Sequence, residues 1–206
     1  MHILQLNTSS TPFVNGQGSI STRLAHDLVR GLQARHPQAT LQVRDLGAHA
    51  PALLDAGSLQ ALYTPAEQRD AQQNARAEQD QALIAELLAA DVVVVGAPMY
   101  NFGVPAQLKA WIDAVTKAGV SFQYSAQGPV GLLKGKVAYV AISSGGRHRG
   151  TPLDHVGPYL QQLFGFLGFA QVHLVYAEGV ALGEAALAQA LQDAQSQIQA
   201  VLPLAA

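Results

Sequence analysis

The 206-residue sequence contains no cysteine. This excludes disulfides, cysteine-ligated zinc, iron–sulfur clusters and catalysis by a thiol. Charge is also scarce, because charged residues make up 13% of the chain, about half of the usual share of roughly 25%. The 12 basic and 14 acidic residues give a net charge of −2. A nucleic-acid-binding protein needs a clustered basic face, so this balance predicts no nucleic-acid partner.

Long apolar runs are missing as well. The most apolar stretch, residues 92–97, lies between Asp91 and Pro98 and is far shorter than the roughly 18 residues that a membrane-spanning helix needs. The first residues lack the basic region of a signal peptide. We therefore expect a cytoplasmic protein that does not enter a membrane. Hydrophobic residues reach 49%, which is typical of a globular chain, and the length predicts a single domain over residues 1–206.

Short apolar runs alternate with longer helical patterns along the whole chain. The runs predict strands at residues 3–6, 41–44, 92–97, 136–142 and 172–176, and the longer patterns predict helices at 19–35, 65–90, 105–116, 156–167 and 184–201. This alternation indicates a doubly wound α/β fold with a parallel sheet and helices on both faces. Five strands on this length favour the order 2-1-3-4-5. Two connections, 46–64 and 117–135, are long, which is often a sign of function or of an interface.

The loop after the first strand is rich in hydroxyl groups and ends at Ser19, where a helix is expected to begin. Backbone N–H groups at a helix start favour a phosphate, and Ser and Thr add further donors. The alternative is that Ser19 serves only as a helix cap. The segment GQGSIS from Gly16 to Ser21 imitates a dinucleotide-binding fingerprint, but it follows its strand too late and lacks the third glycine. The segment GLLKGK from Gly131 to Lys136 is one residue too short for a P-loop.

The loop after the third strand carries Met99, Tyr100, Asn101 and Phe102 side by side. In doubly wound folds, ligands lie at the carboxyl ends of the strands. Aromatic and thioether side chains at this place are suited to covering a flat heteroaromatic ring, while main-chain groups read its polar edge. The alternative is a hydrophobic loop that closes the end of the sheet.

The loop after the fourth strand reads Ser143-Ser144-Gly145-Gly146-Arg147-His148. The two glycines permit a close approach of the backbone to a ligand. His148 is a candidate proton donor or substrate contact, although a lone loop histidine is more often without a role. His148 and His155 lack the further ligands that a metal site requires, so we expect no metal. Neither a G-x-S-x-G motif nor paired carboxylates occur in these loops, which predicts that a cofactor carries the chemistry.

Together the loops resemble a known family, the FMN-dependent NADH azoreductases, also described as NADH:quinone oxidoreductases, of flavodoxin-like fold. The segments that carry the resemblance are Ser9-Ser10, Ser19-Ile20-Ser21, Ala97-Pro98-Met99-Tyr100-Asn101-Phe102 and Ser143-Ser144-Gly145-Gly146. Further support comes from residues 118–124, 128–129, 158–160 and 164–168. The resemblance extends over nearly the whole chain, and the Met-Tyr-Asn-Phe segment is its most specific part.

The resemblance implies a site for tightly but non-covalently bound FMN. Ser10, Ser19, Ile20 and Ser21 would hold the phosphate. The ring would contact Met99, Tyr100, Asn101 and Phe102 along one side, and Ser143, Ser144, Gly145 and Gly146 at its pyrimidine edge. Ser144 stands where the family often has an arginine, and a serine cannot supply the charge of that side chain. The family also implies a homodimer whose substrate pocket includes Phe122, Tyr124, His148 and Phe166, some of them from the partner chain.

The resemblance further implies the reaction. NADH would deliver a hydride to FMN and leave, after which a quinone or an aromatic azo compound would accept it in a ping-pong scheme. No catalytic side chain is required by this scheme, and His148 is the one candidate. An alternative is a flavodoxin-type electron carrier, although the net charge of −2 supplies no strongly acidic docking surface. A second alternative is an interaction protein that has kept the fold without the flavin.

Overall fold

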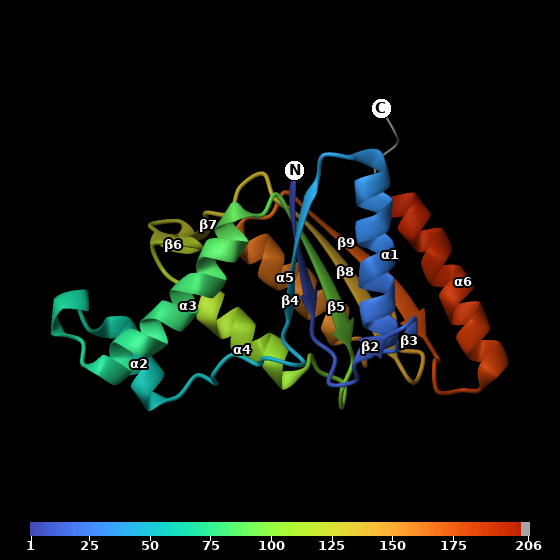
Figure 1. The fold of residues 1–206 in the computed structure, drawn as a ribbon, viewed down its shortest axis with the longest axis horizontal. Coiled ribbons are helices and arrows are strands. Elements are labelled where there is room, and N and C mark those ends of the chain that lie inside the picture. Colours follow the sequence, from blue (N-terminus) through green and yellow to red (C-terminus); the bar gives the residue numbers. More distant parts are fainter. Residues whose placement is uncertain (203–206) are drawn as a thin grey trace.

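A computed structural model describes residues 1–202, and its centre is a sheet of five parallel strands (Figure 1). The strands are β1 (His2–Asn7), β4 (Thr40–Asp45), β5 (Val92–Pro98), β8 (Val137–Ser144) and β9 (Gln171–Glu178). Their spatial order is β4-β1-β5-β8-β9, which is the order 2-1-3-4-5 that the sequence predicts. The flavodoxin-like arrangement is therefore confirmed.

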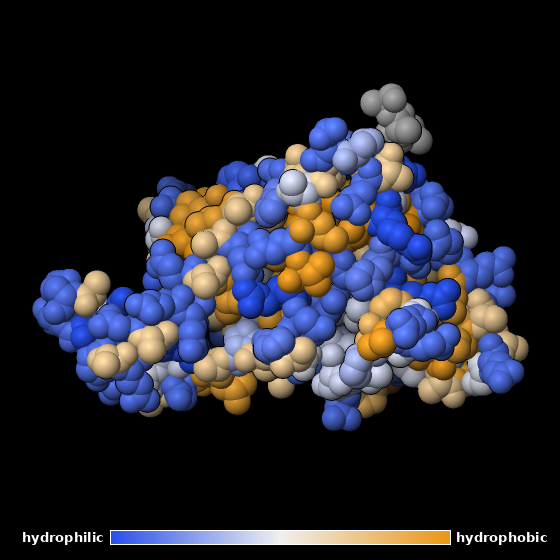
Figure 2. All heavy atoms as spheres, in the orientation of Figure 1, coloured by the Kyte–Doolittle hydropathy of each residue, from blue (hydrophilic) through white to orange (hydrophobic). Residues whose placement is uncertain are grey.

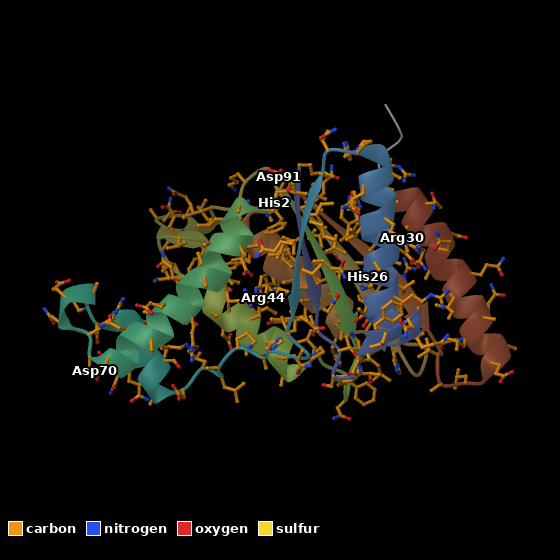
Figure 3. All side chains as sticks on the ribbon, viewed as in Figure 1. His2, His26, Arg30, Arg44, Asp70 and Asp91 are labelled. Carbon is orange, nitrogen blue, oxygen red and sulfur yellow. The ribbon has the colours of Figure 1, made fainter. Side chains whose placement is uncertain are left out.

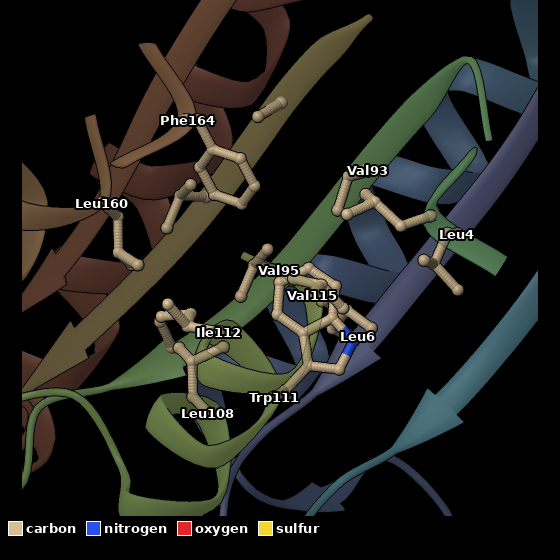
Figure 4. Close-up of a cluster of buried hydrophobic side chains, with 14 of the residues drawn as sticks. Leu4, Leu6, Val93, Val95, Leu108, Trp111, Ile112, Val115, Leu160 and Phe164 are labelled. Atoms are coloured by element: carbon tan, nitrogen blue, oxygen red, sulfur yellow. The ribbon is translucent and has the colours of Figure 1, made fainter. Parts of the chain in front are cut away.

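Helices cover both faces of the sheet. Helices α1 (Ile20–Arg35) and α6 (Glu184–Val201) pack on one face, and α3 (Ala71–Ala89), α4 (Ala106–Val115) and α5 (Val156–Leu167) pack on the other (Figure 1). All seven residues of β5 are buried, as expected for the central strand of a sheet covered on both sides. On the α4 side, Trp111 is fully buried among Leu6, Val95 and Val115 (Figure 4).

The edge strand β4 is the least buried strand of the sheet, and its exposure explains why its sequence signal is weak. Leu41 and Val43 are 38% and 47% exposed. Arg44 ties this edge to the helical layer, because its Nε donates to Glu86 of α3 over 3.0 Å (Figure 3). The hydrogen bond with Glu86 also raises the pKa of Arg44. No helix within residues 1–202 has both the length and the apolar character needed to cross a membrane.

The single helix predicted over residues 65–90 is wrong in its first part. Pro65 precedes a short 3-10 turn, η1 (Ala66–Gln68), and helix α3 begins only at Ala71. The reason is a capping box, in which Asp70 accepts from the backbone N–H of Gln73 while the Gln73 side chain accepts from the N–H of Asp70. This reciprocal pair fixes a helix start more strongly than the proline before it.

The two long connections contain elements that the sequence pattern does not reveal. The first includes α2 (Ala56–Tyr63), which together with η1 and the start of α3 forms an arm that projects from the body of the molecule (Figures 1 and 2). The second forms an antiparallel hairpin of β6 (Phe122–Ser125) and β7 (Gly128–Gly131). The hairpin lies near α5, and the Leu133 N–H donates to the Leu167 carbonyl over 2.9 Å.

Candidate functional site at the carboxyl ends of β1, β5 and β8

The loops that follow β1, β5 and β8 meet at one edge of the sheet, as parallel strand pairing requires. The register pairs Asn7 with Gly96, and Pro98 with Ser143. Because these residues end or nearly end their strands, the loops begin side by side (Figure 1). This edge also contains the point where the chain reverses its direction of strand addition, which is the usual ligand position in such folds.

The first loop folds back on itself before α1 begins. Phe13–Val14 (β2) pairs with Gln17–Gly18 (β3), and the turn between them is Asn15-Gly16, both with positive φ. Asn-Gly is the strongest short hairpin signal, so the sequence did contain this information. The glycines that imitate a dinucleotide fingerprint therefore serve a hairpin. Gly18 has φ +112°, and a Cβ there would lie 1.9 Å from the Pro12 carbonyl oxygen.

The N-terminus of α1 presents the hydroxyl groups expected at a phosphate site. Ser19 caps the helix by accepting from the Thr22 N–H over 3.2 Å, and its hydroxyl lies 3.1 Å from that of Ser21. Ser21 is completely buried, so its hydroxyl supports Ser19 and does not reach the surface. Within residues 1–202 the N–H groups of Ile20 and Ser21 have no hydrogen-bond acceptor. Such free first-turn donors favour an anion.

Tyr100 joins the third-strand loop to the first loop. Its hydroxyl lies 3.1 Å from the Ser9 hydroxyl, and it accepts from the Ser10 N–H over 3.1 Å. Gln107, in the first turn of α4, reinforces the same junction by donating to the Thr8 carbonyl over 2.7 Å and to the Ser10 hydroxyl over 3.1 Å. Sequence reasoning missed Gln107, since a glutamine in a helix carries no distinctive signal.

The backbone of the third-strand loop is held in an unusual shape. The Met99 N–H donates to the Ser143 carbonyl, and Tyr100 and Gly103 exchange both of their backbone hydrogen bonds. Between them, Asn101 and Phe102 have φ values of +49° and +66°. Two consecutive left-handed residues without a glycine are uncommon and mark functional loops more often than simple turns. Phe102 is 48% exposed, so much of this residue is open to solvent at the end of the sheet.

The fourth-strand loop approaches the third through a pair of rings. Phe102 and His148 meet edge to face, with ring centroids 5.6 Å apart. Gly146 leaves room for the imidazole, because a Cβ at this position would lie 2.8 Å from His148 Nε2. Ser144 donates its hydroxyl to the Gly146 carbonyl over 2.8 Å, so this side chain stabilises the loop. The structure thus brings Ser10, Tyr100, Phe102, Gly146 and His148 to one edge.

Beneath this loop lies a polar support that the sequence did not indicate. Tyr176 of β9 donates to Asp154 Oδ2 over 3.1 Å, and Asp154 Oδ2 also accepts from the Gly150 N–H. Burial and the negative charge of Asp154 raise the pKa of Tyr176, so the phenol stays a donor. Arg149 lies over the Tyr176 ring at 4.8 Å.

The other three predicted pocket residues lie at the opposite end of the sheet in the same chain. Phe122 and Phe166 pack together with ring centroids 4.9 Å apart, and Tyr124 lies against Phe122. Helix α5 runs antiparallel to the strands, and its end at Leu167 bonds to the segment that leads into β8. A strand of eight residues separates the two ends by roughly 25 Å. These aromatic residues can therefore reach a site of this kind only in another chain.

The arrangement fits a ligand with an anionic group at one end and a flat ring at the other. The free donors of α1 would face the anionic group, and the left-handed Asn101–Phe102 segment would offer backbone groups to the edge of the ring. Among residues 1–202 there is no group of three or more His, Asp or Glu side chains that could hold a metal ion.

The fold and this site are those of a flavodoxin-like protein. The chain belongs to the flavodoxin-like fold family, whose sequence model matches residues 1–202. Two curated relatives with the same name are similar to the chain over almost its full length. The chain is 51% identical to the FMN-dependent NADH:quinone oxidoreductase of Aromatoleum aromaticum, over 98% of this chain and 100% of the relative. It is 48% identical to the protein of the same name from Dechloromonas aromatica, with the same coverage.

Solved structures agree on the fold. An azoreductase from Bacillus anthracis superposes with a TM-score of 0.86 at 21% identity, covering 98% of both chains. A structure of a Bacillus anthracis FMN-dependent NADH-azoreductase in complex with FMN gives a TM-score of 0.84 at 21% identity, covering 98% of this chain and all of the other. These identities are low, so the two likenesses establish the architecture alone.

Proposed function

We propose that this chain is an FMN-dependent NADH:quinone oxidoreductase that also cleaves aromatic azo compounds. One structural observation carries the proposal. The left-handed Asn101–Phe102 segment lies between the two other loops, linked to the first through Tyr100 and to the fourth through the contact of Phe102 with His148. The name shared by relatives of about half identity over almost the full length supplies the reaction.

The residues present fit FMN. Ser10, the Ser19 hydroxyl and the free N–H groups of Ile20 and Ser21 would hold the phosphate. Met99, Tyr100, Asn101 and Phe102 would line the ring. At its pyrimidine edge, Ser143, Ser144, Gly145 and Gly146 would contribute main-chain contacts, since the Ser144 hydroxyl is engaged within its own loop.

Bound FMN supplies what no side chain at this edge has, the reversible uptake and release of a hydride. The side chains act by binding and orienting. The Tyr100 hydroxyl holds the first and third loops together, and the exposed Phe102 ring and His148 would form one wall against which NADH and then the electron acceptor stack. One binding place for two successive substrates requires that the first product leaves before the second substrate enters.

A homodimer is part of the proposal. Five large apolar side chains are exposed on helix α2 and on the segment just before it. They are Leu53, Leu54, Leu59, Leu62 and Tyr63. Helix α2 contains no charged residue, so a second copy of the chain could cover this surface without burying a charge. A second copy would also supply the aromatic residues Phe122, Tyr124 and Phe166 that one chain places far from its own site. We place the protein in the cytoplasm because its donor, NADH, is available there.

Steady-state kinetics test the enzyme against the electron-carrier alternative. Initial rates with varied NADH at several fixed benzoquinone concentrations should give parallel double-reciprocal lines, and an aromatic azo dye should lose its colour in the same assay. Turnover that requires an added reductase or an added acceptor protein would instead identify a carrier. Intersecting lines would contradict the proposal that NADH and the electron acceptor bind in turn at the same site.

A further inference from the structure

A short turn after β9 is bound to the fourth-strand loop over its whole length. Ser144 and Glu178 pair at the ends of β8 and β9. Beyond them, the N–H groups of Gly179, Val180 and Ala181 donate to the carbonyls of Gly146, Ser144 and Gly145 over 2.9, 3.2 and 3.3 Å. The turn therefore fixes the peptide planes of the two glycines.

Glu178 extends this connection to the next two residues. Its Oε1 accepts from the His148 N–H over 2.5 Å and from the Arg149 N–H over 2.7 Å. Within residues 1–202, Glu178 forms no ion pair, so its carboxylate is committed to the backbone of this loop. Two N–H donors that converge on one carboxylate oxygen make strong, charge-assisted hydrogen bonds.

The imidazole of His148 is confined by the loop backbone that these hydrogen bonds hold in place. Its Nε2 edge lies against Gly146, and its ring meets Phe102 edge to face. Its Nδ1 is buried and has no hydrogen-bond partner among the described residues. The ring thus has no polar anchor of its own on that nitrogen, and its place depends on the backbone that carries it.

We infer that Glu178 is a positioning residue: its carboxylate holds residues 148 and 149 so that the His148 ring stays against Phe102 at the wall of the substrate place. The expected effect of Glu178 on catalysis rests on the proposed function. The placement of the ring itself is independent of that function. In this role Glu178 acts through the backbone of residues 148 and 149, to which its Oε1 is bonded.

Three variants separate this role from a general loss of structure. Glu178→Ala removes the accepting oxygen, Glu178→Asp withdraws it by one methylene, and Glu178→Gln keeps an oxygen at the same place. Glu184→Ala is the matched control, because Glu184 is an exposed carboxylate six residues further on, with no hydrogen bond to another described side chain. Should Glu178→Ala fail to fold, Glu178→Asp takes its place in the comparison.

The first readout needs neither FMN nor turnover. In a proton–carbon NMR spectrum of the purified protein, the imidazole signal of His148 is identified by its loss in His148→Gln. We expect this signal to move in Glu178→Ala and Glu178→Asp, and to keep its place in Glu178→Gln and Glu184→Ala. An unmoved His148 signal in Glu178→Ala would overturn the inference, whatever the enzyme catalyses.

The second readout is the benzoquinone KM of the FMN-loaded protein. We expect Glu178→Ala to raise it about tenfold, Glu178→Gln to restore it, and Glu178→Ala to add no further increase in a His148→Ala background. An equal increase in that background would show that Glu178 does not act through His148 and would overturn the inference. Absence of NADH:quinone turnover in the parent protein would refute the proposed function and leave the NMR result to decide the positioning role.

Discussion

Single side chains determine how the loops of the site are joined, and Tyr100 is the clearest case. Its hydroxyl contacts both the side chain of Ser9 and the N–H of Ser10. The sequence placed Tyr100 among the ring contacts, but its hydrogen bonds to the first loop follow only from the packing of two loops that lie 90 residues apart. Ser10 therefore depends on Tyr100 for its position.

Tyr100→Phe tests this connection. We expect the variant to fold normally and to bind FMN about tenfold more weakly, since one hydroxyl that orders the phosphate-binding loop is lost. Fluorescence titration of the apoprotein with FMN measures the effect. Tyr63→Phe is the matched control, because Tyr63 lies on the arm and is 79% exposed, so this variant should bind FMN like the parent. Equal affinities in the two variants would show that Tyr100 does not order the loop.

At the scale of elements, the contact between β5 and the start of α1 sets the shape of the site. A Cβ on Gly96 would lie 2.9 Å from the Ser21 carbonyl oxygen. The central strand and the helix that carries the anion donors are therefore in backbone contact. Gly165, in the last turn of α5, is the comparison site, because a Cβ added there would meet nothing within 4 Å.

Gly96→Ala should lower the free energy of unfolding by about 1–3 kcal/mol, because the added methyl forces α1 away from β5. Gly165→Ala should raise it by about 0.5–1 kcal/mol, because an open helical site gains from the loss of backbone freedom in the unfolded chain. Urea unfolding of both variants gives the two values. A neutral Gly96→Ala would mean that the helix start is free to move.

The pH dependence of stability also belongs to an element, helix α1. His26, labelled in Figure 3, packs against Phe13 of the first loop in a tilted arrangement, with ring centroids 5.4 Å apart. Burial lowers the pKa of His26, Arg30 lowers it further, and Asp27 opposes both. The folded state therefore binds the proton less readily than the unfolded chain. Its contribution to stability is complete above the ordinary value of 6.5 and is lost as the pH falls toward the lowered pKa.

His26→Gln should accordingly lose less stability than the parent between about pH 7.5 and pH 5, as measured by urea midpoints at both values. His49→Gln replaces an exposed histidine and should follow the parent curve. If His26→Gln loses as much stability as the parent on acidification, His26 does not contribute to the acid sensitivity.

At the scale of the whole molecule, the strands and the helices of the two layers follow from apolar periodicity, and the strand order follows from the alternation and number of the strands. Periodicity carries no information on the arm. There the Asp70–Gln73 capping box delays the start of the helix, and the β6–β7 hairpin occupies a connection without strong strand patterning. The distant placement of Phe166 depends on the direction of α5 in three dimensions, and the roles of Glu178 and Gln107 depend on contacts between segments far apart in sequence.

The exposed apolar arm makes the oligomeric state testable. Leu62 is 42% exposed on α2, and Leu62→Glu should shift the protein from dimer to monomer in sedimentation equilibrium, because a charge would be buried in the interface. Leu182→Glu changes a residue that is 61% exposed before α6 and should leave the dimer intact. A parent protein that sediments as a monomer would contradict the proposed dimer.

The most direct test of the proposed reaction is an anaerobic reduction and reoxidation of the bound flavin. The purified protein is reconstituted with FMN, freed of excess, mixed with NADH and then with benzoquinone, while the yellow flavin absorbance is followed. We expect the flavin to be retained, its absorbance to disappear rapidly with NADH, and the absorbance to return with the quinone. Retained flavin that NADH does not bleach would contradict the NADH-driven reaction, and failure to retain flavin would contradict the site itself.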